Sequence, residues 1–339
     1  MDKSILPLGK LPPELAVKLL QNAPLLDPRV IIGPGVGLDC AVITLGDTCL
    51  VMKSDPITFA SEDIGWYAVQ ICANDIATTG AVPRWFLSTL LLPEGKTTPD
   101  MVERIAEQIF QACREKNISV VGGHTEITYN LDRPILMGTM IGEVPTDQLI
   151  TPKGAKAGNR LLLTKGVPIE GTAIIAKEFP EKVRNLLGED AQQNAADYIH
   201  NPGISVFLDA QFAIQAGHIT AMHDPTEGGL AAALWEMATA CGHTLVIQPH
   251  NIEIAELSEK LCRAFKLDPL ATIASGALLM AVTAEDSRAV CIALEKHGIP
   301  CSEIGYIETG DVQVYSETAN ERTTLPWPQR DEITRLFES

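Results

Sequence analysis

The segment from Asp63 to Ala81 strongly limits the fold, because it is an apolar helical run that carries one acid on its apolar face. Ile64, Ala68 and Ile71 recur at helical spacing. Asp75 lies on the same face, four residues after Ile71. A buried ionised carboxylate is costly unless a cation, a partner charge or several donors meet it. Asp75 is therefore either a structural acid that caps the local backbone or part of a functional site.

The chain length and the order of predicted elements indicate two domains of mixed α and β structure, an α+β fold class. A chain of 339 residues is long for one hydrophobic core. The first half is expected to hold helices at 12–20, 63–75 and 98–113, with strands at 39–45, 48–55, 85–92, 118–121 and 136–144. The second half is expected to hold strands at 160–165, 244–248, 277–283 and 303–307, with helices after Gly171, within 180–217, at 230–241 and at 285–297. We predict a first domain over 1–150, a second over 151–315 and a polar tail over 316–339.

The charge of the chain limits its partners. The net charge of −17 and the pI near 4.8 argue against nucleic acid and anionic membranes, which attract basic surfaces. The start of the chain lacks a signal-peptide pattern, and no apolar run is long enough to span a bilayer. The eight cysteines form no CxxC pair, which is typical of a reducing compartment. We therefore expect a cytoplasmic protein, and the sequence leaves the reactivity of Cys40 and Cys301 open.

Four places in the first half could meet a metal–nucleotide complex. They are Asp39 after a Gly-rich turn that includes Gly37, Asp55 at a strand end, Asp75, and the segment 122–126. Magnesium prefers hard oxygen ligands, and scattered carboxylates that bridge to phosphates suit it. Glycine turns let backbone amides approach phosphate oxygens. Each place also has a structural explanation, since an Asp at a strand end and a Gly-Gly pair are both common in turns.

The second half contributes one further motif, Asp224-Pro225-Thr226-Glu227, followed by Gly228 and Gly229. Asp224 at the N-cap and Glu227 at the third helical position would form a capping box. Alternatively, the helix N-terminus and the two glycines would receive an anion. Spacing favours the cap, and both functions can coexist. At the other end of the chain, Lys10 either closes over phosphates or is a solvated surface charge.

The ordered set of motifs resembles the aminoimidazole ribonucleotide (AIR) synthetase superfamily, also called PurM-like, and is most similar to its branch of the hydrogenase maturation factor HypE. The resemblance covers nearly the full chain. The motifs that carry it are Gly37-Leu38-Asp39, Lys53-Ser54-Asp55, Asn74-Asp75-Ile76-Ala77-Thr78-Thr79-Gly80-Ala81, Gly122-Gly123-His124-Thr125-Glu126 and Asp224-Pro225-Thr226-Glu227-Gly228-Gly229.

This resemblance implies a two-domain PurM-like fold whose N-terminal domain pairs strands with a second subunit to form a dimer sheet or barrel. It also implies bound ATP and Mg²⁺. The implied metal ligands are Asp39, Asp55 and Asp75, and the implied catalytic residues are Asp75 and Asp224. The implied contacts to the nucleotide and substrate are Asn74, Gly122, Gly123, Glu126, Gly228 and Gly229. Lys10, Gly37, His124 and Thr125 complete the set of predicted nucleotide contacts.

Three departures from the family pattern qualify the functional prediction. Leu38 stands where relatives carry an acid, His124 stands where many carry Asp, and the chain ends at Ser339 without the cysteine on which HypE carries a carbamoyl group. We therefore expect Mg-ATP-dependent activation of a small amide, carbonyl or phosphorylated metabolite by a homodimer, and not carbamoyl dehydration on its own tail. The alternative is a non-enzymatic nucleotide-binding scaffold or a partner subunit in a maturation complex.

Overall fold

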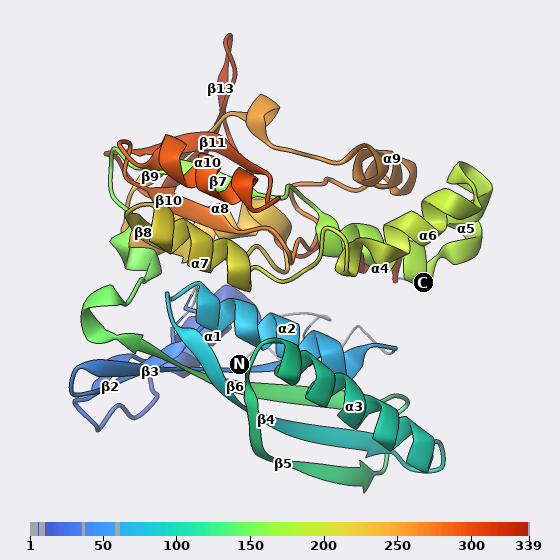
Figure 1. The fold of residues 1–339 in the computed structure, drawn as a ribbon. Helices are drawn as coiled ribbons and strands as arrows, with labels where there is room; N and C mark the ends of the chain where they lie inside the picture. The colour runs from blue at the N-terminus through green and yellow to red at the C-terminus, as the bar shows by residue number, and fades with distance from the viewer. Residues whose placement is uncertain (1–5, 7–10, 36–37, 58–61, 338–339) are drawn as a thin grey trace.

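The computed structural model describes residue 6 and residues 11–35, 38–57 and 62–337. Lys10 and Gly37, two of the expected nucleotide contacts, lie outside the described residues. The chain folds into two β-sheets with helices packed on them (Figure 1). The first sheet belongs to the N-terminal half and the second to the C-terminal half, in agreement with the expected mixed α and β architecture.

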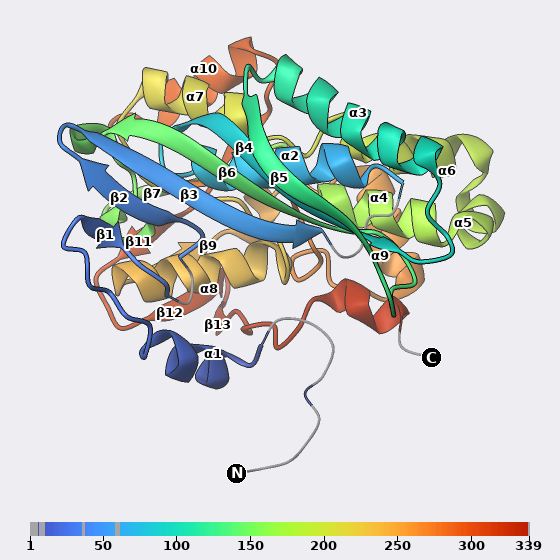
Figure 2. The same cartoon turned by 90° about the horizontal axis from the view of Figure 1, so that it is seen from below.

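The N-terminal half is a six-stranded sheet with two long helices on one face. Its strands lie in the order β1-β2-β3-β6-β4-β5. Figure 1 shows α2 and α3 above this sheet, and Figure 2 shows that no described helix covers most of its opposite face. The elements are α1 (Pro13–Leu20), β1 (Val30–Ile32), β2 (Ala41–Leu45), β3 (Thr48–Ile57), α2 (Ile64–Ala77), β4 (Val82–Pro93), α3 (Pro99–Glu115), β5 (Ser119–Thr128) and β6 (Ile135–Pro145).

Helix α2 is the centre of the N-terminal core. It is buried along nearly its whole length, as expected for a helix that is apolar on most of its circumference. Gly65 lets α3 approach closely, because a Cβ at this position would lie 2.5 Å from the carbonyl oxygen of Ile105. Ala77, at the other end of α2, packs in the core of the C-terminal half. The helix therefore joins the two halves and carries Asp75 to the boundary between them.

The C-terminal half is built on a seven-stranded sheet in the order β13-β12-β9-β11-β7-β10-β8. Three of its helices, α5, α6 and α9, gather at one side of this sheet (Figure 1). The elements are β7 (Arg160–Thr164), α4 (Ile169–Glu178), α5 (Pro180–Leu187), α6 (Glu189–Ala196), α7 (Phe207–Ala216), β8 (Ile219–His223), α8 (Gly229–Cys241), β9 (Thr244–Ile247), α9 (Glu256–Phe265), β10 (Leu279–Val282), α10 (Ser287–Lys296), β11 (Cys301–Glu308), β12 (Gln313–Glu317) and β13 (Arg322–Thr324).

Most predicted elements are present, and the exceptions lie mainly in the second half. The sequence patterns did not indicate β1 in the first half, or β8, α9, β12 and β13 in the second. The expected tail also joins the fold, because Trp235 Nε1 of α8 donates a hydrogen bond to the carbonyl oxygen of Leu325 at 3.0 Å. The proposed domain limits at residues 150 and 315 stay a prediction. Among the residues that the structure describes, helices that combine the length and the apolarity needed to cross a bilayer are absent.

Candidate functional site

Asp75 meets a lysine at the boundary between the two halves. Its side chain is almost fully buried on α2, and its Oδ2 atom lies 3.4 Å from Nζ of Lys53 on β3. The same Nζ lies 4.0 Å from Oδ1 of Asp39, just before β2. Two neighbouring elements of the first sheet and the buried helix therefore direct one cation and two acids into a common space.

The C-terminal half adds a histidine and a third acid to this space. His223 ends β8, and Asp224 follows it. His223 Nδ1 lies 3.8 Å from Asp39 Oδ2, and its Nε2 lies 2.7 Å from Oε2 of Glu236 on α8. Ligand atoms of Asp39, His223 and Asp224 all lie within 4.8 Å of one another. We call Asp39, Lys53, Asp75, His223 and Asp224 the acid cluster.

The acid cluster contains buried polar atoms that no hydrogen bond satisfies. Both carboxylate oxygens of Asp224, Oδ2 of Asp75 and Nδ1 of His223 have no hydrogen-bond partner among the described residues. Asp224 is 1% exposed and His223 is 3% exposed. Buried polar atoms in native proteins are normally paired, and exceptions mark strain, function or an absent ion. A bound cation would satisfy these buried atoms.

The pKa values of the cluster reflect the same excess of negative charge. Burial and the neighbouring Asp39 raise the pKa of Asp224 to about 7. Burial also raises the pKa of Asp75 well above its usual range, against the opposing effect of Lys53. Burial alone would lower the pKa of His223, but Asp39, Glu236 and Asp224 outweigh it and raise the pKa to about 10. Without a bound ion, protons on His223 and the carboxyl groups therefore limit the negative charge.

Asp55 also belongs to this neighbourhood. It lies on β3 opposite Gly138 of β6, and its charge contributes to the raised pKa values of Lys53 and Asp75. The structure thus brings all three predicted metal ligands, Asp39, Asp55 and Asp75, near one another and places the predicted catalytic Asp224 beside them. Their roles in binding and catalysis stay predictions.

The segment 122–126 lies apart from the acid cluster within one chain. The glycine pair was expected to form a turn, and this prediction is wrong, because Gly122 to Glu126 continue β5 as an extended edge strand. Strands β4 and β6 separate β5 from β3, a distance of about 14 Å at the usual strand spacing. Gly123 has a packing reason, since a Cβ there would lie 2.1 Å from the carbonyl oxygen of Ser88.

The side chains of this segment are exposed on the described chain. His124 Nε2 lies 3.3 Å from Glu126 Oε2, and Thr125 between them is also exposed. One isolated chain therefore does not bring Gly122, Gly123, His124, Thr125 or Glu126 to the acids. Their predicted contact with a nucleotide stays untested.

The capping box expected at Asp224 is absent. Helix α8 begins at Gly229, and its N-cap is Gly228 in the left-handed conformation, with φ +80°. Oδ2 of Asp331, 103 residues away, accepts a hydrogen bond from the Gly228 amide at 2.6 Å. Gly229 is required by close packing, because a Cβ there would lie 2.5 Å from the carbonyl oxygen of Thr272. The structure thus explains both glycines without an anion and leaves Asp224 free of a capping function.

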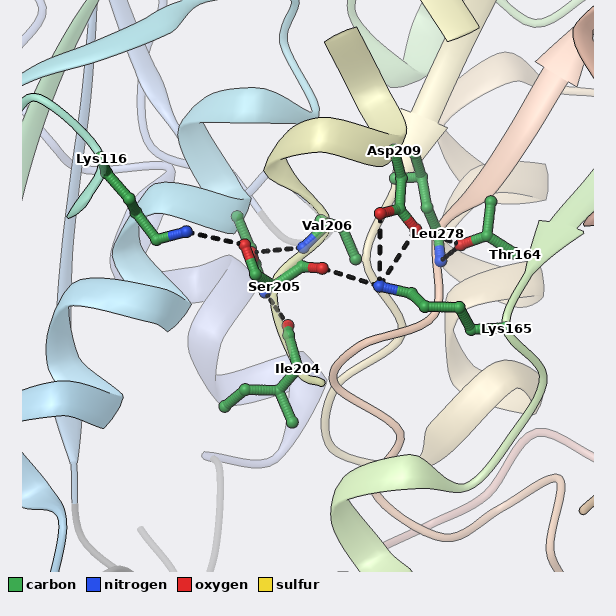
Figure 3. A network of polar contacts seen from close by, with 9 residues as sticks. Lys116, Thr164, Lys165, Ile204, Ser205, Val206, Asp209 and Leu278 are labelled. Atoms are coloured by element: carbon green, nitrogen blue, oxygen red, sulfur yellow. Dashed lines mark hydrogen bonds and ion pairs between the residues drawn. The ribbon is translucent and has the colours of Figure 1, made fainter. Parts of the chain in front are cut away.

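Asn74, expected beside the metal ligands, instead holds a loop of the C-terminal half. Its Nδ2 donates to the carbonyl oxygen of Ile204 at 2.7 Å, and its Oδ1 accepts from the amide of Val206 at 2.9 Å. Lys116 Nζ donates to Ser205 Oγ at 2.9 Å, as Figure 3 shows. These contacts favour a positioning role for Asn74, while its predicted contact with a nucleotide stays untested.

A buried ion pair of the C-terminal half contacts the same 204–206 loop that Asn74 and Lys116 bind. Lys165 Nζ donates to the carbonyl oxygen of Ser205 at 2.7 Å and lies 3.1 Å from Asp209 Oδ2 (Figure 3). Thr164 Oγ1 donates to the same Asp209 oxygen at 2.7 Å. We call Asn74, Lys116, Thr164, Lys165, Ile204, Ser205, Val206 and Asp209 the Ser205 network.

The two cysteines left open by the sequence are not activated thiolates. Burial raises the pKa of Cys40 well above its usual range. The thiol of Cys291, whose Sγ lies 3.5 Å from that of Cys301, and burial together raise the pKa of Cys301. Cys301 lines a hollow of about 360 Å³ that also includes Lys165 and does not include the acid cluster.

Sequence reasoning missed Lys53, His223 and Glu236 as members of the site. Lys53 and His223 each stand next to or near a predicted acid, in Lys53-Ser54-Asp55 and His223-Asp224, and this proximity was the available signal. Glu236 carries no signal in the sequence, because its contact with His223 depends on the packing of α8 beside β8.

Comparison with known proteins agrees with this arrangement of motifs. Residues 37–144 match the model of the AIR synthase related protein N-terminal domain, and residues 156–316 match that of the C-terminal domain. The chain belongs to the AIR synthase related family. A candidate hydrogenase expression/formation protein of Methanocaldococcus jannaschii is 30% identical over 318 residues, which cover 90% of this chain and 91% of that protein.

Two further members of the family show how far the similarity extends. The carbamoyl dehydratase HypE of Cupriavidus necator is 29% identical over 85% of this chain and 82% of its own length. A crystal structure of the hydrogenase maturation protein HypE in complex with ATP superposes with a TM-score of 0.71 at 23% identity, over 94% of this chain and 91% of that chain. The PurM-like mixed α and β fold predicted from the sequence is thereby confirmed.

Proposed function

We propose that the protein binds Mg-ATP at the acid cluster and uses it to activate a small amide, carbonyl or phosphorylated metabolite. The observation that carries this proposal is that buried carboxylate oxygens of Asp75 and Asp224, from the two halves of the chain, lack a hydrogen bond among the described residues, while the charge of Asp224 acts on Asp75. The names of the relatives support it, since one is a carbamoyl dehydratase and one solved member of the family holds ATP.

The residues present fit a magnesium–nucleotide complex. Asp39, Asp55 and Asp75 offer the hard carboxylate oxygens that Mg²⁺ prefers, and the excess negative charge of the cluster accommodates a divalent cation. When bound, ATP would supply the phosphoryl group, and Mg²⁺ would neutralise the negative charge of the phosphates. Lys53 orients the Asp75 carboxylate at 3.4 Å. Asp224, from the second half, holds the reacting oxygen of the substrate, because phosphoryl transfer depends mainly on positioning and charge neutralisation.

Calorimetric titration of ATP with and without magnesium tests the proposal. The wild type should bind ATP only with Mg²⁺, and Asp75→Asn should abolish this binding. Asp132→Asn is the matched control, because Asp132 is a fully exposed acid of the same half and its loss should leave binding unchanged. Failure of the wild type to bind ATP at any magnesium concentration would overturn the proposal.

We also propose that two copies of the chain associate through β5. This strand is an edge of the first sheet, and Val121 and Ile127 are 54% and 59% exposed on it. Tyr129, directly after the strand, is 72% exposed. Long exposed apolar edge strands are usually covered in native proteins. Light scattering after gel filtration should give a dimer, and Val121→Lys combined with Ile127→Lys should give a folded monomer. A monomeric wild type would contradict this arrangement.

A second candidate function is that of a nucleotide-binding scaffold or of a partner in a maturation complex. Leu38, in place of an acid, favours this alternative, as does the similarity to a candidate hydrogenase formation protein. Phosphate release during incubation of Mg-ATP with amide, carboxylate and phosphorylated metabolites distinguishes the two. ATP that is bound but never consumed indicates the scaffold. In either case we place the protein in the cytoplasm, since all eight cysteines are unpaired.

A further inference from the structure

We propose that His223, Asp39 and Asp224 form a distinct ion position that takes a transition-metal dication, of the Mn²⁺, Co²⁺ or Zn²⁺ class, through an imidazole nitrogen. This position would be separate from the magnesium that accompanies ATP. The inference shares Asp39 and Asp224 with the proposed function, but it concerns metal binding without nucleotide and can therefore be tested independently.

Three candidate ligand atoms from the two halves of the chain lie close together. Atoms of Asp39, His223 and Asp224 lie within 4.8 Å of one another. His223 Nδ1 and both oxygens of Asp224 are buried and accept or donate no hydrogen bond among the described residues. An acidic cluster alone would not indicate a metal, but buried ligand atoms of His223 and Asp224 that lie close together without a hydrogen bond do.

The distance between His223 and Asp39 favours an ion over a direct contact. Nδ1 and Oδ2 lie 3.8 Å apart, which is too far for a hydrogen bond. Two ligand atoms that are each about 2.1 Å from a common metal lie about 3.4 Å apart at a tetrahedral angle, and up to about 4.2 Å apart at wider angles. The observed gap falls inside this range, so it can hold a shared ion without a change of backbone.

A hydrogen bond on the outer side of the imidazole ring also supports a metal ligand at His223. His223 Nε2 lies 2.7 Å from Oε2 of Glu236. Histidine ligands usually donate the other ring N–H to a carboxylate, which fixes the ring orientation and leaves the inner nitrogen with its lone pair directed at the metal. Glu236 is thus a positioning residue. Because it lies on α8, the packing of that helix sets the orientation of the His223 ring.

The nitrogen ligand sets the class of metal. Magnesium takes oxygen ligands almost exclusively, whereas imidazole nitrogen suits transition metals such as Zn²⁺, Cu²⁺, Fe²⁺ and Ni²⁺. One imidazole and two carboxylates therefore select a transition metal by their donor atoms. The local charge agrees, since the charges of Asp39, Asp224 and Glu236 all act on His223, and Lys53 Nζ lies as far as 4.0 Å from Asp39 Oδ1.

The test uses the full chain, stripped with a chelator and free of nucleotide. Titration with Co²⁺, followed by visible absorption, should show one tightly bound ion, with Mg²⁺ at least a hundredfold weaker. With Mn²⁺, pulsed electron paramagnetic resonance should show coupling to a ring nitrogen. His223→Gln should weaken Co²⁺ binding at least tenfold and remove the nitrogen coupling. His250→Gln replaces an exposed histidine and should change nothing.

Glu236→Gln guards against a folding defect in the first variant. It keeps the size of the side chain at a half-buried position and should weaken Co²⁺ binding about tenfold, the usual effect of losing such an outer carboxylate. Circular dichroism confirms the fold of each variant. Equal Co²⁺ and Mg²⁺ affinity in the wild type, or unchanged Co²⁺ binding and nitrogen coupling in His223→Gln, would overturn the inference. Normal Co²⁺ binding without any ATP binding would overturn only the proposed function.

Discussion

Two buried polar assemblies lie between the halves of this protein, and they differ in how completely their groups are paired. In the Ser205 network, the amide group of Asn74 makes two hydrogen bonds, and Lys165 contacts both a carbonyl oxygen and Asp209 (Figure 3). In the acid cluster, both oxygens of Asp224 and Nδ1 of His223 have no hydrogen-bond partner among the described residues. The two assemblies are similarly buried and both cross between the halves.

This difference separates structural from functional polarity. A buried polar group that is fully paired rigidifies the fold and is costly to disturb, while an unpaired one costs free energy until a ligand meets it. The Ser205 network therefore belongs to the stability of the molecule, and the acid cluster belongs to binding. Mutation should reveal the contrast as opposite signs of the change in the free energy of unfolding.

The largest effect is expected from Asp209→Ala in the Ser205 network. The change leaves the ammonium group of Lys165 buried without its carboxylate and also removes the acceptor of Thr164 Oγ1. Breaking one partner of a buried ion pair typically lowers the free energy of unfolding by about 3–5 kcal/mol. Urea denaturation followed by circular dichroism measures this loss.

A double variant provides the control for this loss. Asp209→Leu combined with Lys165→Met removes both charges and should recover much of the lost stability, because apolar replacements of a buried pair are often neutral. Equal instability of the double variant and Asp209→Ala would mean that the network stabilises through its hydrogen bonds to the 204–206 loop rather than through the ion pair.

A smaller effect of opposite sign is expected from Asp224→Asn in the acid cluster. The carboxyl pKa is raised from an ordinary 3.8 to about 7, so its contribution to stability is full below pH 3.8 and is lost as pH rises through about 7. The neutral amide avoids this loss. In the presence of a chelator, the variant should exceed the wild type by about 2–3 kcal/mol at pH 8.

The pH profile decides whether this gain has an electrostatic cause. Urea midpoints of the wild type and Asp224→Asn should converge near pH 4, where the wild-type carboxyl group is protonated. A gain of the same size at pH 4 and pH 8 would contradict the charge argument. A loss of stability at pH 8 would show that the Asp224 carboxylate is paired and would end the contrast between the two assemblies.

The smallest effect is expected from Lys116→Met, at the edge of the Ser205 network. This change removes one hydrogen bond, from Nζ to Ser205 Oγ at 2.9 Å, and keeps the aliphatic stem. We expect a loss of about 1 kcal/mol, the usual net value of such a bond. Lys96→Met is the matched control, since Lys96 is 58% exposed and its removal should change stability by less than about 0.5 kcal/mol. Equal effects of the two changes would place Lys116 outside the network.

Local sequence patterns predicted the elements that depend on apolar spacing and on helix caps. The spacing of apolar residues located α2, and Thr98 indicated the start of α3, where its Oγ1 accepts a hydrogen bond from the Met101 amide at 3.2 Å. Carboxylate chemistry grouped Asp39, Asp55 and Asp75 as candidate metal ligands, but only the family resemblance added Asp224 to them, because the proximity of these residues depends on the tertiary fold.

The incorrect predictions arise where distant residues override a local pattern. Residues 224–227 match the sequence pattern of a capping box. The helix begins later, at Gly229, and Asp331, 103 residues away, accepts the hydrogen bond from the Gly228 amide. The pair Gly122-Gly123 is typical of a turn, but neighbouring strand β4 holds it extended. Lys53 and Glu236 were missed because their importance comes from burial beside particular charges, which no single segment encodes.

The loop at 204–206 has a consequence for how the gene can be divided. Both sides of the molecule attach to this one tripeptide, through Asn74 and Lys116 from the N-terminal half and through Lys165 from within its own half. A fragment that ends near residue 150 would expose the side chain of Asn74, which is fully buried in the whole chain, to solvent. The complementary fragment would expose the 204–206 loop. The two parts should therefore be expressed together. A chimera that exchanges one half must keep Asn74 and Lys116 compatible with the 204–206 loop of the other half.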